Sequence, residues 1–478
     1  MEKQGGAARP NDIADTEKSS NVTISSGSAT PPLQWQAPID EKALVRKIDR
    51  RLIPILFIIY VAAFLDRVNI SNALTMSLPK DLKLVGVERN IALTIFFVPY
   101  ILFEIPSNML MKRFRPHIWL SGCILAFGII MLAQGFVTTY GGLLATRFFL
   151  GLTEAGIFPG SFYLISIWYK REEAQQRFTV YWCSVLLASA FGGLLASAIA
   201  NMDGVQNIHN WQWIFILEGI CTIVIGIVAF FLVSDFPEDA KWLNTDERKF
   251  VLTRSRGIEQ VRSIAGRDVL VFFKHFKNIL GGIMYLCLVI PVYSFAYFTP
   301  TILKTYGYSV VQTQLHTVPP VAAAFALCLI MAYLSDRLSL RSPFIAFGVS
   351  LTISGLAILM TVHDNLHAEY AGICLVAMGM FSSGPVIVCW YVMNLHGHVE
   401  RAIGTAWMIG FGNCGGIIAT FSFLQADAPI YHTGYSICMG ATCICAVAAI
   451  LYGAIAWKEN KSLRARAQDD GTAEYYSL

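Results

Sequence analysis

Charged residues are scarce in this sequence, and their scarcity excludes most classes of soluble protein. They make up 14% of the 478 residues, against 55% hydrophobic residues, whereas soluble globular domains carry about 25% charged residues. Lysine and arginine exceed aspartate and glutamate by only 36 to 32. This small, dispersed excess does not indicate nucleic-acid binding. The composition therefore predicts a polytopic membrane protein.

Sequence motifs of catalysis and metal binding are also missing. The 11 cysteines include no CxxC pair and no histidine partner at zinc-ligand spacing, so we interpret them as small apolar residues at helix contacts. No P-loop, nucleophile elbow or HExxH sequence occurs. We expect a protein that is not an enzyme and that needs no cofactor or metal.

The start of the chain has no hydrophobic stretch of the kind found in a secretory signal. It is rich in Ser, Gly, Ala, Thr and Pro, a composition typical of disorder. We therefore expect a disordered cytoplasmic tail over residues 1–45, and membrane insertion through the first apolar run.

Long apolar runs fill most of the remaining sequence, and each is long enough for a transmembrane helix. The first six lie at about 52–74, 91–111, 118–137, 141–167, 177–200 and 212–233. The second six lie at about 279–300, 314–334, 342–362, 369–393, 402–424 and 434–457. We predict an all-α membrane protein with 12 transmembrane helices in two six-helix bundles, at 46–233 and 279–457, with a cytoplasmic linker at 234–278 and a cytoplasmic tail at 458–478.

Basic residues gather at alternate ends of the predicted spans. Those flanking the first, second and fourth spans are Arg46, Lys47, Arg50, Arg51, Lys112, Arg113, Arg115, Lys170, Arg171 and Arg177. By the positive-inside rule, both termini and the linker should be cytoplasmic. The loop that holds Lys80, Lys83 and Arg89 does not follow this pattern. The default location is the plasma membrane.

Four charged residues lie deep inside two of the predicted spans: Asp66 and Arg67 in the first, Arg147 and Glu154 in the fourth. A charge near the bilayer centre costs about 2.5–3.5 kcal/mol on insertion scales, so such residues usually face a bundle interior or a cavity. Arg147 and Glu154 are two helical turns apart and share one helix face. The opposite directions of the two helices allow all four charges to share one layer.

These four residues carry our mechanistic hypothesis. Arg67 would hold a substrate carboxylate as a two-point fork, and Asp66 and Glu154 would carry the coupling protons. Arg147 would set the acidity of Glu154 and is a second substrate-binding candidate. Protonation of either acid leaves a net positive cavity, so proton and anion would stabilise each other's binding. The alternative interpretation is two neutralising ion pairs that hold the helices together.

A loop motif follows the eighth span. The sequence LSDRLSLR at 334–341 resembles the motif G-x-L-A-D-R-x-G-R-R of the major facilitator superfamily, with departures at Ala332, Ser339 and Leu340. Its counterpart after the second span, NMLMKRFR at 108–115, has Lys112 in place of the aspartate. The resemblance implies a conformational latch made of Asp336, Arg337, Arg341, Arg113 and Glu104. We expect Arg113 as the partner of Glu104, and a structural pairing for Glu218, the other intramembrane acid.

Several further stretches resemble the anion:cation symporter family, in particular its fungal allantoate, nicotinate and pantothenate permease branch. They include FLDRVNISNA at 64–73, RFFLGLTEAGIFPG at 147–160 and WQWIFILEG at 211–219, with others at 96–108, 298–302, 413–416 and 427–434. The resemblance implies substrate translocation by alternating access, driven by protons. It also places Tyr100, Ser382, Ser383, Trp390 and Asn413 at positions that line the binding site, with ordinary helix packing as the alternative for each.

The sequence thus predicts a proton-coupled symporter for a small organic anion, such as a vitamin- or ureide-like carboxylate. Its expected partners are this anion, protons and the lipid bilayer, with the protein acting as a monomer. The alternatives are export of a carboxylated metabolite and a transport-inactive nutrient sensor. Drug-proton antiporters carry a Gly-Pro-x-x-Gly-Gly pattern in the fifth span, and the missing proline before Gly192 and Gly193 argues against export.

Overall fold

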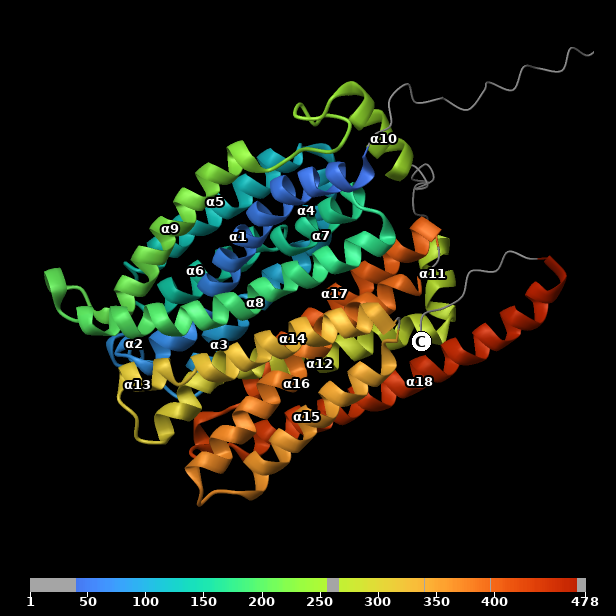
Figure 1. The fold of residues 1–478 in the computed structure, drawn as a ribbon. Coiled ribbons are helices and arrows are strands. Elements are labelled where there is room, and N and C mark those ends of the chain that lie inside the picture. The colour runs from blue at the N-terminus through green and yellow to red at the C-terminus, as the bar shows by residue number, and fades with distance from the viewer. Residues whose placement is uncertain (1–39, 256–265, 339, 396, 471–478) are drawn as a thin grey trace, which may run out of the picture. The chain divides into compact units, whose positions relative to one another are not determined.

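The structure, a computed structural model, describes residues 40–255, 266–338, 340–395 and 397–470. Within these ranges the regular elements are helices (Figure 1). Twelve helical segments there are long and apolar enough to cross a membrane. The prediction of an all-α protein with 12 transmembrane helices is therefore confirmed.

The first bundle contains six spans, of which two are broken into a pair of helices. They are α1 (Glu41–Thr75), α3 (Glu88–Thr94) with α4 (Phe97–Arg113), α5 (Pro116–Gln134), α6 (Tyr140–Glu154) with α7 (Ile157–Trp168), α8 (Arg171–Ile199) and α9 (Asn210–Leu232). Helix α1 packs on α8 and α9, and α5 packs along α9 and α6. The short α2 (Leu78–Asp81) and the 3-10 turns Ala200–Met202 and Val205–Asn207 lie in its connections.

The second bundle repeats this arrangement. Its spans are α12 (Phe276–Thr305), α13 (Val310–Leu315) with α14 (Val318–Leu338), α15 (Ser342–Thr361), α16 (Leu366–Met393), α17 (Gly397–Ser422) and α18 (His432–Asp470), and a 3-10 turn lies at Gln425–Asp427. Helix α12 packs on α17 and α18, and α15 packs on α16. The two bundles meet where α1 contacts α12, α4 contacts α17, and α8 contacts α13 and α14.

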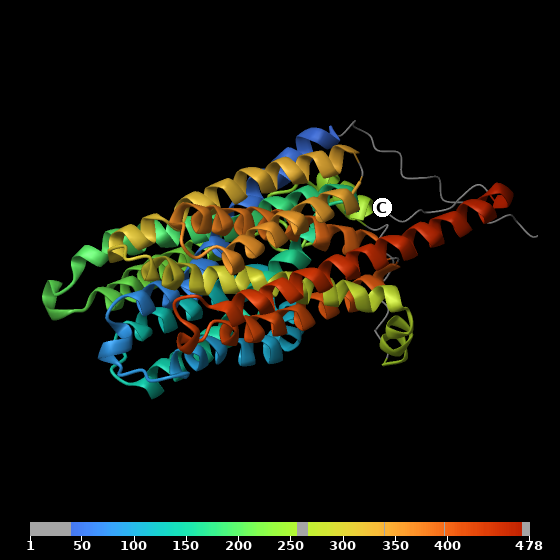
Figure 2. The ribbon, with the colours of Figure 1, turned by 90° about the horizontal axis from the view of Figure 1, so that it is seen from below.

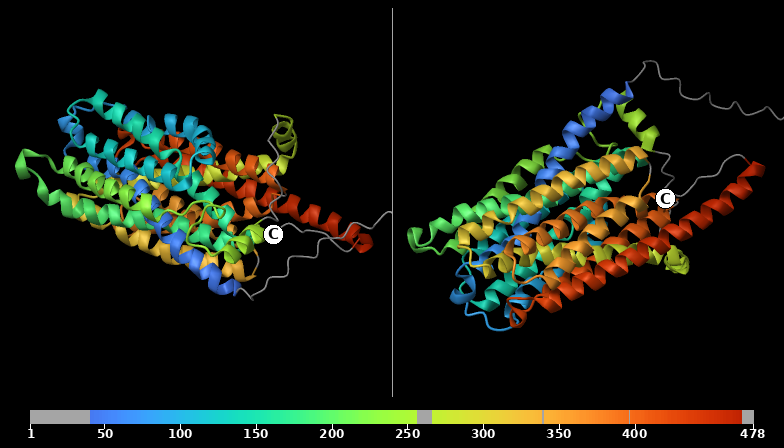
Figure 3. Two further views of the ribbon diagram at one scale, coloured as in Figure 1. Left: turned by 90° about the horizontal axis from the view of Figure 1, so that it is seen from above. Right: turned by 60° about the horizontal axis from the view of Figure 1, so that its bottom comes forward.

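Two short helices, α10 (Thr245–Ser255) and α11 (Gly266–Lys274), lie in the chain between the bundles. They lie at the end where α1 begins, which we call the linker end (Figure 3). The opposite end, which holds α2 and α13, we call the loop end (Figure 1). Lys47 of α1 contacts Glu247 of α10 at 2.8 Å, and this ion pair fixes α10 on the first bundle.

Several helices extend beyond the boundaries predicted from hydropathy. Helix α1 begins at Glu41, inside the predicted tail, because the Asp40 side chain caps it by accepting hydrogen bonds from the N–H groups of Lys42 and Ala43 at 3.0 and 3.2 Å. Residues 1–39 of that tail lie outside the described residues. Helix α18 continues to Asp470 and runs past the other helices at the linker end (Figure 2). An apolar window marks only the part of a helix that lies in lipid.

Two of the first-bundle spans break just before a proline. Pro99 and Pro159 lack the N–H group that would bond the carbonyl one turn earlier, and the breaks fall between α3 and α4 and between α6 and α7. Gly151 of α6 lies against the first break, where a Cβ atom would collide with the carbonyl oxygen of Phe96. This close approach brings the start of α4 next to the end of α6.

Polar side chains bridge the two bundles near the loop end. Asn90 of α3 donates to the carbonyl oxygen of Thr420 of α17 at 2.6 Å. The Thr75 carbonyl of α1 accepts a hydrogen bond from Lys304 of α12, and its hydroxyl accepts one from Gln314 of α13 at 3.1 Å. These bonds hold the loop end closed.

Candidate functional site

The centre of the molecule contains a two-point ion pair between Arg67 of α1 and Glu154 of α6. Arg67 donates through Nε to Oε2 of Glu154 at 3.2 Å and through Nη2 to Oε1. The side chains are each 1% exposed. The pairing of the planar guanidinium with both carboxylate oxygens is the strongest geometry available to these groups. The acid and the arginine therefore neutralise each other in a buried position.

Aromatic rings enclose the Arg67 guanidinium. Its carbon lies 4.9 Å from the ring centre of Tyr100, 5.1 Å from that of Phe96 and 5.5 Å from that of Phe64. Tyr293 of α12 closes the enclosure from the second bundle and accepts a hydrogen bond from Nη1. Ring faces attract cations, so Arg67 is held by both bundles at once.

Arg147 is as deeply buried as Arg67, but its guanidinium makes fewer hydrogen bonds. It is 1% exposed, and its Nη1 donates to the backbone carbonyl of Arg67 at 3.3 Å. Its Nε and Nη2 atoms have no hydrogen-bond acceptor in the described structure. A guanidinium offers five donors and no acceptor. Arg147 is thus a buried cation with donors available for an anion.

Asp66 lies apart from the Arg67 ion pair, on the face of α1 toward α9. Its Oδ2 accepts a hydrogen bond from the Thr222 hydroxyl at 2.8 Å. Its carboxyl group also contacts that of Glu218, one turn before Thr222 on α9. The four predicted charged residues therefore lie in one layer. Arg67 pairs with Glu154 of α6, whereas Asp66 contacts Thr222 and Glu218 of α9 instead of pairing with Arg147.

Tyr100 contacts the Arg67 guanidinium, and Glu104 has a partner that the sequence did not predict. Asn413 of α17 donates to Oε2 of Glu104 at 3.2 Å. The expected partner Arg113 is exposed at the end of α4, two and a half turns beyond Glu104. The prediction of a Glu104–Arg113 pair is wrong, because Glu104 faces the second bundle rather than the end of its own helix.

Ser382, Ser383 and Trp390 of α16 do not join this cluster. The two hydroxyls donate to backbone carbonyls of their own helix, including that of Gly379 at 3.2 and 2.7 Å. The Trp390 ring packs on Tyr452 of α18 with 4.7 Å between ring centres. These contacts favour the alternative of helix packing within the second bundle.

The predicted latch residues of the second half form a local pair. Arg341 donates to Asp336 at 2.6 Å and to the Ser335 hydroxyl at 2.7 Å. Arg337, between them in sequence, is exposed. The motif thus ties the end of α14 to the start of α15.

Sequence reasoning missed Phe96 and Tyr293 as neighbours of Arg67 and assigned Glu218 to a structural role elsewhere. The depth of Glu218 in its span would have identified it as a neighbour of Asp66. Glu218 lies eight residues from the loop end of α9, and Asp66 lies nine residues from the loop end of α1. At about 1.5 Å per residue, both are roughly 12–14 Å from that end. No comparable signal marks Tyr293, since aromatic residues occur throughout α12.

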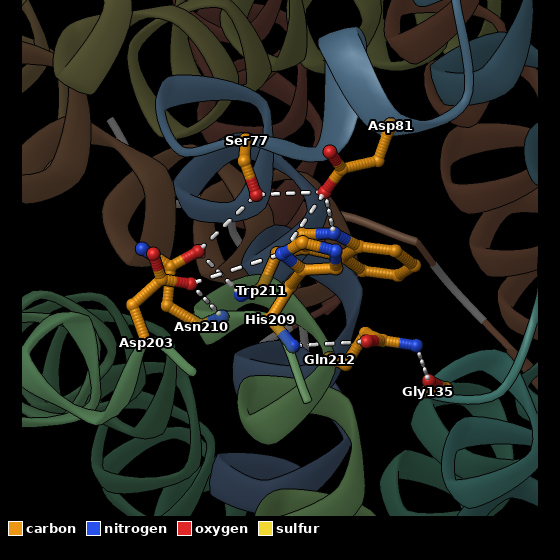
Figure 4. Close-up of polar contacts among 8 residues, drawn as sticks. All are labelled: Ser77, Asp81, Gly135, Asp203, His209, Asn210, Trp211 and Gln212. Carbon is orange, nitrogen blue, oxygen red and sulfur yellow. Dashed lines mark hydrogen bonds and ion pairs between the residues drawn. The ribbon is translucent and has the colours of Figure 1, made fainter. Parts of the chain in front are cut away.

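A second polar cluster lies at the loop end and joins α2 to α9 (Figure 4). Asp81 accepts a hydrogen bond from Nε1 of Trp211 at 2.7 Å, and His209 lies 3.8 Å from Asp81 and 3.9 Å from Asp203. The described residues contain no group of three or more His, Cys, Asp or Glu suited to a metal ion. We interpret this cluster as a structural contact that joins the loops of the first bundle.

Comparisons with known proteins agree with this architecture. The MFS-type transporter cnsO of Penicillium expansum is 31% identical over 88% of this chain and 84% of its own length. The major facilitator-type transporter hxnP of Emericella nidulans is 31% identical over 85% and 83%. A bacterial homolog of the human lysosomal transporter Spinster, solved facing inward, has the same fold with a TM-score of 0.64 at 14% identity, over 84% of this chain and 95% of its own.

A family model adds a direct assignment. The model of the Major Facilitator Superfamily matches residues 56–420, a range that reaches from α1 to α17 and includes every residue of the central cluster. Together with the fungal relatives above 30% identity, this match identifies the family. The chain belongs to the major facilitator superfamily of membrane transporters.

Proposed function

We propose that this transporter takes up a small organic anion together with protons, by alternating access. The observation that carries the proposal is the Arg67–Glu154 ion pair, in which a glutamate occupies the fork that a substrate carboxylate would use. Protonation removes the charge of Glu154 and weakens the pair, because a neutral carboxyl cannot hold a guanidinium as tightly. Arg67 then becomes available to an anion.

Arg147 supports the same cycle from a second position on α6, where it donates to the backbone carbonyl of Arg67. Its Nε and Nη2 atoms, which have no acceptor in the described structure, offer a first contact for the substrate carboxylate before Arg67 is released from Glu154. This assignment keeps Arg147 among the substrate-binding residues expected from the sequence and gives it a direct contact with the anion, beyond an effect on the acidity of Glu154. Both arginines now act on the substrate, and Glu154 is the group whose proton decides between ion pair and substrate.

Coupling follows from this exchange. An anion binds well only when Glu154 is protonated, and the proton is retained only while an anion balances the two arginines. Each ligand raises the affinity for the other by the same factor. Tyr293 connects the exchange to the second bundle, because it contacts Arg67 from α12 and must follow any movement of that side chain.

We place the linker end in the cytoplasm and the protein in the plasma membrane, with both termini cytoplasmic. The support is the excess of Lys and Arg at that end. The bridges from Thr75 to Lys304 and Gln314 then close the external path. This arrangement corresponds to a state that exchanges its ligands with the cytoplasm.

The test is uptake of labelled carboxylates by cells that lack their own permeases, with and without a protonophore. Wild-type protein should accumulate at least one anion of the panel only while the proton gradient persists. Glu154→Gln should lose accumulation but retain exchange of internal for external anion. Glu247→Gln, an acid of the linker helix, serves as the matched control and should behave as wild type. Full accumulation by Glu154→Gln, or gradient-independent accumulation by wild type, would contradict the proposal.

A further inference from the structure

Glu218 is an acid that the cycle above does not use, and its environment is unusual. It is 5% exposed, and Asp66 is fully buried. Neither oxygen of Glu218, nor Oδ1 of Asp66, has a hydrogen-bond donor in the described structure. The two carboxyl groups contact each other. Three buried acceptor atoms therefore lie together with no hydrogen-bond donor among the described residues.

A single bound proton provides the donor that these oxygens lack. Two ionised carboxylates in contact repel each other, and burial removes the water that would screen them, so both cannot be charged at once. If one carboxyl is protonated, its O–H donates to the other, and the pair carries a single negative charge. Such a proton belongs to both residues and leaves when either one changes its surroundings.

The groups around the pair allow it to exchange this proton during transport. On α9, Thr222 donates to Asp66 at 2.8 Å, and Cys221 is the other titratable neighbour. On α6, Arg147 acts electrostatically on both Asp66 and Glu154, and Glu154 acts on Asp66 as well. Arg67, next to Asp66 in the sequence, is engaged by Glu154, and Tyr297 of α12 acts on Arg147.

We propose that Asp66 and Glu218 form a second proton-binding site that holds one transported proton between two carboxyl groups, distinct from the Arg67–Glu154 site. This inference rests on the proposed proton-coupled function and extends it. An anion drawn to Arg147 reduces the positive charge that Asp66 experiences, which favours the protonated pair. The pair thus takes up its proton with the anion and releases it when the anion leaves.

Infrared titration of the purified full-length protein in lipid tests this directly, with the proton itself as the ligand. The measurement follows the carbonyl band of protonated carboxyl groups from about pH 5 to about pH 9, the range in which buried carboxyls titrate. Wild-type protein should show a band that disappears within this range. Asp66→Asn and Glu218→Gln should each lose that same band, because an amide N–H replaces the shared proton. Glu247→Gln should keep it.

Three outcomes would overturn the inference. They are a wild-type spectrum without the band, a band retained in both single variants, or a band that persists unchanged to about pH 9, which would mark a fixed, structural proton. Size-exclusion profiles and unfolding temperatures of each variant show whether it has folded. The titration needs no substrate, so it can fail independently of the uptake assay. A titrating band together with failed proton-coupled uptake would reject the proposed function alone. Proton-coupled uptake without the band would reject only the shared proton of Asp66 and Glu218.

Discussion

Arg67 and Glu154 meet through two guanidinium nitrogens and both carboxylate oxygens across α1 and α6, deep inside the part of the chain that crosses the membrane. The contact makes each residue unavailable to any other ligand until the pair opens. In the proposed cycle, this site is closed by its own charges and opens when a proton neutralises the acid.

Arg67→Lys should disable uptake although it keeps the positive charge. An ammonium group cannot form the two parallel bonds of a guanidinium, and the loss of one charged hydrogen bond is worth roughly 1.5–3 kcal/mol, or at least about a tenfold decrease in rate. The measurement is the initial uptake rate of the anion identified in the carboxylate screen. Arg267→Lys, on the exposed side of α11, should retain the wild-type rate. Equal rates for both variants would show that the fork geometry does not matter.

Gly151→Ala should destabilise the first bundle. The added Cβ atom would collide with the carbonyl oxygen of Phe96, and overpacking of this kind costs about 1–3 kcal/mol. Gly141→Ala, in the same helix but with nothing within 4 Å of its Cβ position, is the matched control. Thermal unfolding of the two purified variants should give a lower midpoint only for Gly151→Ala. A wild-type midpoint would mean that the break at Phe96 shifts without strain.

Asn90→Leu should weaken the closure of the loop end. Asn90 donates to the Thr420 carbonyl at 2.6 Å and to the Phe423 carbonyl at 3.4 Å, and the substitution leaves these carbonyls without this donor. Hydrogen exchange measured by mass spectrometry should accelerate in α3 and in the last turn of α17. Asn201→Leu, whose side chain donates to the Ser197 carbonyl at the end of the adjacent α8, should leave both segments protected. Unchanged exchange in Asn90→Leu would argue that apolar contacts alone close this end.

The docking of α10 should depend on pH through Glu247. Burial raises the pKa of this carboxyl, but hydrogen bonds from Lys47 and the N–H of Asn244 lower it more, and its net pKa is below the ordinary value. A lowered pKa contributes stability above the pKa of the unfolded chain, and this contribution disappears as the pH falls through the folded value. At neutral pH, Glu247→Gln should therefore cost under about 1 kcal/mol, as expected for a surface pair.

Unfolding midpoints measured across pH check this dependence. Wild type and Glu247→Gln should differ at neutral pH and converge below about pH 4, where the carboxyl of wild type is protonated. Glu238→Gln, at an exposed position before α10, should match wild type throughout. A difference between wild type and Glu247→Gln that persists in acid would assign the effect to packing rather than charge.

Composition and hydropathy were enough to predict the membrane class, the 12 spans and the charged layer. The spans follow from the length of chain that a bilayer requires, and the layer follows from the cost of an unexplained charge in lipid. Both properties depend on distance along a helix axis, which the sequence records directly. The helix ends were less predictable, since Asp40 caps α1 in water and leaves no mark in an apolar window.

The tertiary structure decided which residues face each other. Helices such as α16 are apolar on all sides, so the sequence contains no stripe that fixes their rotation about the axis. Rotation turns Ser382, Ser383 and Trp390 toward their own bundle. The rotations of the helices also pair Arg67 with Glu154, leave two donor atoms of Arg147 without an acceptor, and bring Glu218 into contact with Asp66. The sequence determined how deep each charge lies, and packing between helices determined its partner.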